Sequence, residues 1–108
     1  MKASEVLAAA RDEIEKGWTQ NTFEDHEGSV CAVGAISRAA AQHKDTVDGL
    51  DGFIDLCDAQ ETATAALERL VHEHGGRSIM SYNDHATDKQ QVLDLFDKAI
   101  AGLEERGE

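Results

Sequence analysis

The chain has 108 residues, of which 22 are Asp or Glu and 10 are Lys or Arg, and its formal net charge is −12. This length suits a single domain over residues 1–108, and a hydrophobic content of 41% indicates a globular rather than a disordered chain. The acidic excess argues against direct binding to nucleic acid or to anionic membranes, because binding to phosphates requires clustered cations.

Cysteine use and hydropathy predict a reduced, cytoplasmic protein. The two cysteines, Cys31 and Cys57, are too few for a disulfide scaffold. The N-terminus lacks the basic and apolar regions of a signal peptide, and no apolar run approaches the ~20 residues that span a bilayer. The chain also has no proline and much alanine, which favours an all-α fold.

The first predicted helix covers residues 3–16, where apolar residues recur at helical spacing. Gly17 follows directly, and we expect it to form a left-handed C-cap. The polar residues 17–28 then connect this helix to the next one. A small β-hairpin is expected near residues 22–30, because the turn-forming residues there follow a threonine and a phenylalanine.

The second predicted helix covers residues 30–43, with Ser29 as its N-cap. From Gly28 to Lys44 there is no Asp or Glu, and apolar residues surround nearly the whole helix, which indicates a buried helix. Gly34 lowers helix stability by up to ~1 kcal/mol relative to alanine, so we expect a close backbone approach at this position to compensate.

Residues 44–58 are predicted to form a loop with one or two short helical turns, because Gly49 and Gly52 interrupt any long helix. Three apolar side chains are expected to dock this loop on the core: Leu50, Phe53 and Ile54. Aspartates recur at every third or fourth position, but they lack the alternating order and terminal glutamate of a calcium-binding loop. We therefore interpret them as a solvated acidic face.

Two further helices are predicted at residues 59–74 and 88–104. Asp58 is the expected N-cap of the first of these helices. Thr87 and Gln90 form a capping-box pattern at the start of the second.

The four helices together predict an all-α domain with an orthogonal or bundle-like arrangement. Three of them are expected to pack around the buried second helix. A connector at residues 77–86, partly extended at Ile79 and Met80, is expected before the last helix.

Three short motifs occur in a fixed order along the chain: Gly17-Trp18-x-Gln20, Gly28-x-x-Cys31-x-x-Gly34-Ala35 and Tyr82-Asn83-Asp84. This ordered set resembles a family of small uncharacterised proteins from actinobacteria and their bacteriophages. The resemblance implies one helical domain and a host or phage origin, and it implies no particular reaction. The chain departs from the family pattern where Tyr82 replaces a tryptophan and where Thr19 replaces a frequent cysteine. Position 19 is therefore not expected to carry chemistry.

Cys31 and His85 are the candidate catalytic residues. A thiolate at the start of the second helix is stabilised by unpaired N–H groups and by the helix dipole. With Gln20 as oxyanion donor, His85 as base and a neighbouring Asn or Asp to orient it, the set matches the roles of a thiol-dependent hydrolase or transferase. The alternative is a buried cysteine that packs like alanine, since free cysteine is among the most buried residue types.

A second hypothesis is a polar cluster that binds a small ligand. Its predicted members are Trp18, Gln20, Tyr82, Asn83 and Asp84. Alternatively, Asn83, Asp84 and His85 close a turn before the last helix, because Asn and Asp side chains readily bond to nearby backbone. His72 and His74 lie two residues apart and point to different sides of a helix, so neither a metal site nor a cofactor is predicted.

The leading functional hypothesis is a non-enzymatic acidic interaction protein, phage-encoded, that binds a host protein. It depends on the net charge of −12, on the incomplete catalytic set and on the family resemblance. The alternatives are a thiol-dependent enzyme that uses Cys31, a small-ligand-binding domain, and a nucleic-acid mimic that occupies a basic site on another protein.

Overall fold

A computed structural model describes residues 1–108 and contains five helices and no β-sheet. The helices are α1 (Ala3–Lys16), α2 (Ala32–Lys44), α3 (Gly49–Glu73), α4 (Ile79–His85) and α5 (Lys89–Glu105). They contain 70% of the residues, so the predicted all-α fold is confirmed, with five helices in place of four. Helix α1 has the bounds that its periodicity predicts.

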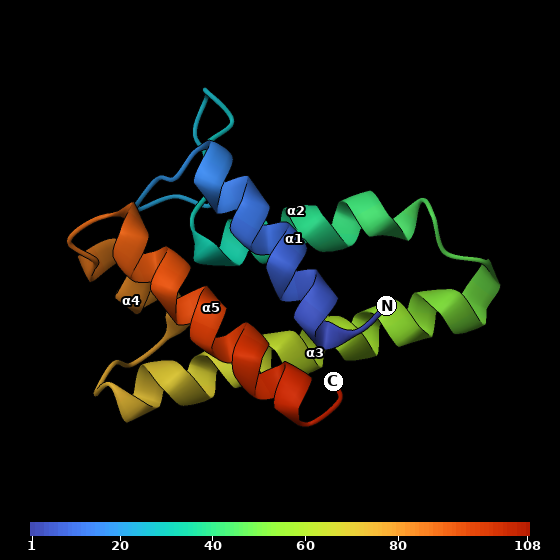
Figure 1. Ribbon diagram of the computed structural model, residues 1–108. Coiled ribbons are helices and arrows are strands. Elements are labelled where there is room, and N and C mark those ends of the chain that lie inside the picture. Colours follow the sequence, from blue (N-terminus) through green and yellow to red (C-terminus); the bar gives the residue numbers. More distant parts are fainter.

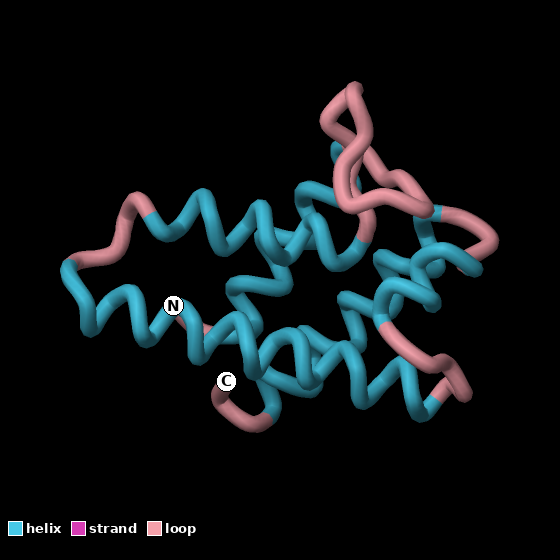
Figure 2. The backbone as a smooth tube through the Cα atoms, turned by 180° about the vertical axis from the view of Figure 1, so that it is seen from behind, coloured by secondary structure: helices cyan, strands magenta, loops and turns pink.

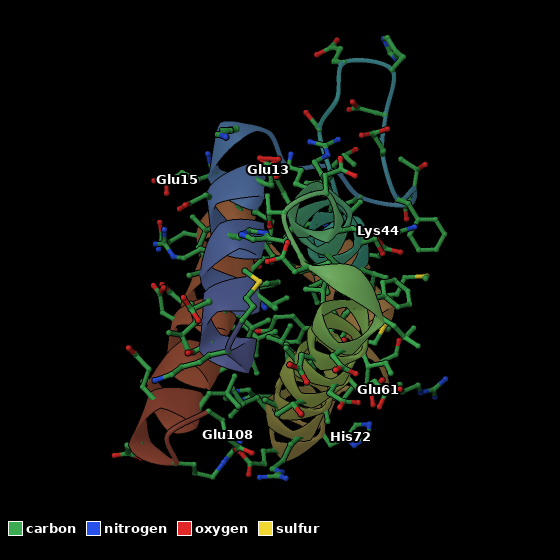
Figure 3. The ribbon with its side chains drawn as sticks, turned by 90° about the vertical axis from the view of Figure 1, so that its right-hand side faces the viewer. Glu13, Glu15, Lys44, Glu61, His72 and Glu108 are labelled. Carbon is green, nitrogen blue, oxygen red and sulfur yellow. The ribbon has the colours of Figure 1, made fainter.

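The helices lie in two layers. Helices α1 and α5 pack side by side in one layer, while α2 and α3 run in opposite directions in the other (Figure 1, Figure 3). Helix α4 closes one end against α2 and α3. The shortest extent of the molecule is 19 Å, which fits two layers because packed helix axes lie about 8–10 Å apart.

A core of 23 buried apolar residues joins all five helices. Phe96 of α5, Leu7 of α1 and Leu67 of α3 are among the largest side chains that it encloses completely. Helix α2 contributes only one face to this core, because Ala35 and Ala39 are buried while Ser37 is exposed. Helix α2 is therefore not the buried central helix that the sequence predicts. None of the helices combines the length and the apolar composition needed to cross a bilayer.

The segment between α1 and α2 is a protruding loop (Figure 2), in which the expected small hairpin is reduced to one antiparallel bridge between Glu24 and Val30. Two isolated bridges hold its base, one between Trp18 and Val30 and one between Glu24 and Val30, and no ladder continues from them. Gly17 is extended, with φ of −174°, and is not the left-handed cap that the sequence predicts. A Cβ on Gly17 would lie 3.3 Å from Cα of Ser29, so the returning loop backbone passes close to this glycine.

Helix α2 begins two residues later than predicted, and its N-cap is Cys31 rather than Ser29. Sγ of Cys31 accepts a hydrogen bond from the backbone N–H of Gly34 at 3.3 Å. Ser29 lies in the loop, where its backbone N–H donates to Oδ1 of Asp25 at 2.9 Å. The Asp25 carboxylate thus binds the backbone of the turn, and the Cys31 sulfur caps α2.

Helix α3 is the largest departure from prediction, since the expected loop at 44–58 is helical from Gly49 onward. Gly49 has φ of 68°, a left-handed conformation that glycine adopts without steric cost. A Cβ on Gly52 would lie 3.1 Å from Cβ of Val47, so the preceding turn packs closely over this glycine. The two glycines therefore shape the start of the helix, and Asp58 lies in its interior rather than at a cap.

The ends of α4 and α5 also differ from the predicted ones. The expected connector is helical, and Oγ of Ser78 caps it by accepting from the backbone N–H of Ser81 at 3.0 Å. The N-cap of α5 is Asp88, whose Oδ1 accepts from the backbone N–H of Gln91 at 3.0 Å. The predicted capping box at Thr87 is wrong, because the backbone N–H of Thr87 donates to the side chain of Gln91.

Candidate functional site

The three sequence motifs meet where the loop after α1 packs against α4. Asn83 lies at this junction and is 0% exposed. Its Oδ1 accepts hydrogen bonds from Nε1 of Trp18 at 2.8 Å and from the backbone N–H of Ala32 at 3.0 Å. Its Nδ2 donates to the carbonyl oxygen of Thr19 at 3.1 Å and to Oδ1 of Asp84 at 3.2 Å. One side chain thus ties the loop, the start of α2 and α4 together.

Gln20 caps the C-terminal end of α4 from outside the helix. Its Nε2 lies 3.0 Å, 3.2 Å and 3.1 Å from the carbonyl oxygens of Asn83, Asp84 and Ala86. The last carbonyls of a helix lack partners within it, so an amide donor satisfies them. The backbone N–H of Asn21 donates to Oδ1 of Asp84 at 2.8 Å, with Asn21 held at φ of 68°. We call the four connecting side chains the clasp: Trp18, Gln20, Asn83 and Asp84.

The clasp directs its polar groups inward. No buried side-chain nitrogen or oxygen in the protein lacks a hydrogen-bond partner. The amides of Gln20 and Asn83 donate chiefly to main-chain oxygens, so the arrangement fixes the loop on the helical layer. Four of the five predicted binding residues are therefore brought together, in contacts with one another and with backbone.

Tyr82, the fifth predicted binding residue, lines a separate surface cleft of about 410 Å³. Its ring centroid lies 6.5 Å from that of His74. Arg77, His85 and Gln91 also line this cleft, which is open and polar. The tyrosine is thus half-buried against the core on one side and turned to solvent on the other.

The two candidate catalytic residues are not hydrogen-bonded to each other. Cys31 is 2% exposed, and its thiol is used in capping α2. His85 is exposed, and its Nδ1 donates a hydrogen bond to the carbonyl oxygen of Ser81 at 2.8 Å. The structure does not assemble the pair into a nucleophile–base dyad.

The remaining histidines do not gather into a metal site. Nε2 of His72 lies 3.1 Å from the carbonyl oxygen of Arg77. No group of three or more His, Cys, Asp or Glu side chains is arranged to hold a metal ion.

The close approach expected at Gly34 is present, and its partner is the loop. A Cβ on Gly34 would overlap the carbonyl oxygen of Phe23. The same oxygen accepts from the backbone N–H of Cys31 at 3.1 Å. Gly34 therefore lets the loop descend onto the first turn of α2.

Sequence reasoning missed an apolar surface at the start of α3. The side chains expected to dock a loop are instead turned to solvent: Leu50 is 72% exposed, Phe53 39% and Ile54 46%. With the half-buried Cys57 they stand at helical spacing, within an arc of about 100° at 100° per residue. We call these four residues the α3 stripe. Their i, i+3, i+4, i+7 spacing is visible in the sequence once the two glycines are accepted inside a helix.

Comparison with known proteins gives one match. No curated protein and no solved structure matches the chain. The sequence model of a family of unknown function, DUF6197, matches residues 1–102. Because this match covers nearly the whole chain, the protein belongs to the family of unknown function DUF6197.

Proposed function

We propose that this protein is a non-enzymatic interaction protein that binds another protein through its acidic surface. The observation that carries the proposal is the α3 stripe, since three of the six exposed large apolar side chains of the protein lie within residues 50–54. Apolar clusters exposed on a soluble domain commonly mark contact surfaces. Large exposed aliphatic and aromatic side chains have no role in solubility, so a partner that covers them would account for their presence.

Charge supports the same proposal. The chain carries a net charge of −12, and acidic surfaces attract basic partners and speed their association. The order of the motifs extends the proposal to the origin of the protein. We propose that it comes from actinobacteria or their bacteriophages and that its partner is a host protein in the same cytoplasm. The clasp then serves as the scaffold that holds the helices in place.

Affinity capture tests this function. The tagged protein is incubated with actinobacterial lysate at about 50 mM and 500 mM salt, and retained proteins are identified by mass spectrometry. We expect a partner that is enriched over a tag-only control at low salt and weakened at high salt, because exposed charges are screened. Absence of any specific partner at both salt concentrations would contradict the proposal.

A further inference from the structure

Helices α2 and α3 form an arm at one end of the molecule, and its negative charge lies on α3 and on the connecting loop. Helix α2 contains no Asp or Glu, and Nζ of Lys44 lies 5.7 Å from the ring centroid of Phe53. The two helices run in opposite directions and are joined at the tip of the arm by residues 45–48 (Figure 1, Figure 2). Between Asp45 and Glu68 the chain has seven Asp or Glu residues and no Lys, Arg or His. None of these seven carboxylates forms an ion pair or a side-chain hydrogen bond: Asp45, Asp48, Asp51, Asp55, Asp58, Glu61 and Glu68.

The arm combines apolar and acidic groups along one line. The α3 stripe occupies the first two turns, and the same side of the helix continues through Glu61 and Glu68, at 100° per residue. Figure 3 shows Glu61 on the side of α3 that is turned away from α1 and α5. A shallow groove of about 410 Å³ starts at Cys57 and runs past both glutamates. The surface therefore offers apolar contacts at one end and negative charge at the other.

We infer that this surface of α3 is a docking site for a basic amphipathic helix of a partner protein, an inference that rests on the proposed function. The partner would place apolar side chains at i, i+3, i+4 and i+7 on the stripe, and Lys or Arg side chains beside Glu61 and Glu68. From Leu50 to Glu68 the surface extends about 27 Å at 1.5 Å per residue, which a helix of about 18 residues matches.

Charge favours a basic partner helix over a second copy of the chain or a membrane surface. A second copy of the chain would bring two sets of unpaired carboxylates together, which is unfavourable. An anionic membrane surface would be repelled for the same reason. A partner helix with cations spaced along its apolar edge gains both hydrophobic burial and ion pairing.

Peptide binding to the full-length protein tests the inference. The probes are fluorescein-labelled peptides of about 18 residues with leucines at helical spacing in one half and lysines on the same face in the other, made in both orders. A peptide of the same composition with scrambled order is the control. We expect anisotropy titrations to show binding of an ordered peptide at least about tenfold tighter than of the scrambled one, a difference of about 1.4 kcal/mol.

Paired variants then locate the binding surface. Leu50→Ser with Ile54→Ser should weaken peptide binding at least about tenfold, whereas Met80→Ser, an exposed apolar residue on α4, should leave it unchanged. Glu61→Gln with Glu68→Gln should weaken binding and reduce its salt dependence. Glu104→Gln with Glu105→Gln on α5 removes the same charge elsewhere and should have little effect.

Four outcomes would overturn the inference. Equal weakening by the α3 and α5 charge variants would mean non-specific attraction. A wild-type dimer in light scattering that Leu50→Ser and Ile54→Ser dissociate would mean that a second copy covers the stripe. Failure of both ordered peptides to bind would also refute it. If the lysate partner is still captured by the α3 variants, the proposed function stands and only the docking surface is wrong.

Discussion

The carbonyl oxygen of Phe23 occupies the space that a side chain at Gly34 would need. Replacing Gly34 by alanine should therefore push the loop away from α2 and weaken the hydrogen bond from Cys31 to the same oxygen. Overpacking of this kind costs about 1–3 kcal/mol. We expect a loss of that size in the free energy of unfolding, measured by urea denaturation followed by circular dichroism.

Gly102→Ala is the matched control, because Gly102 also lies inside a helix and a Cβ there would meet no atom within 4 Å. Without a clash, the same substitution should stabilise the protein by about 0.4–1 kcal/mol. Opposite signs for the two variants are the expected result. Stabilisation by Gly34→Ala would show that the loop does not approach α2 as described.

Two substitutions test the capping role of Gln20: one replaces its donor with an acceptor of similar size, and the other removes the donor. Gln20→Glu replaces the donating amide with a carboxylate that faces the carbonyl oxygens of Asn83, Asp84 and Ala86. Gln20→Ala only removes the donor. We expect the glutamate variant to be less stable than the alanine variant by about 1 kcal/mol or more at neutral pH, because like partial charges are brought together. Equal stabilities would argue against a capping role.

Arg11 and Asp97 join α1 to α5, with Nε of Arg11 donating to Oδ1 of Asp97 at 2.6 Å. This hydrogen bond raises the pKa of the Arg11 guanidinium above its usual range. Its stabilising effect is complete below the usual arginine pKa and is lost only above it, so it is constant through neutral pH. A double-mutant cycle with alanine should give a coupling of about 0.2–1 kcal/mol. That coupling should shrink in 1 M salt, and a value unaffected by salt would contradict this interpretation.

The two cysteines should differ in accessibility, which tests the thiol-enzyme hypothesis. Cys31 is buried and engaged in capping, whereas Cys57 is half-buried on the stripe. We expect iodoacetamide to label Cys31 at least about 100-fold more slowly in the folded protein than in urea, because labelling requires local opening. Peptide mass spectrometry resolves the two sites in the same sample, with Cys57 as the internal reference. Rapid labelling of Cys31 in the folded state would instead favour a reactive thiol.

The sequence predicted the all-α class because local periodicity decides it. The bounds of α1 follow from apolar spacing that no other contact opposes. The start of α3 could not be predicted, since the effect of Gly52 depends on Val47 packing over it. Helix propensity alone predicts that glycine destabilises a helix, and here the tertiary contact outweighs that preference.

The site was only partly predictable for a similar reason. The motifs group Trp18 and Gln20 with Asn83, which lies 63 residues after Gln20, and the structure brings these side chains together at Asn83. Sequence could not show that their polar groups face backbone rather than solvent, because this depends on where the carbonyls of α4 end. The exposed stripe does not follow from the sequence because Gly49 and Gly52 predict a loop around Leu50 and Ile54, and helical spacing has no meaning in a loop.

Asn83 joins the three sequence motifs in the clasp, and its substitution tests this arrangement most directly. Asn83→Ala leaves the backbone N–H of Ala32 and Nε1 of Trp18 without their acceptor. Each unpaired buried group costs about 1–3 kcal/mol, so we expect a loss of about 2–4 kcal/mol in the free energy of unfolding by urea denaturation. A loss below about 0.5 kcal/mol, the range of ordinary surface substitutions, would contradict the claim.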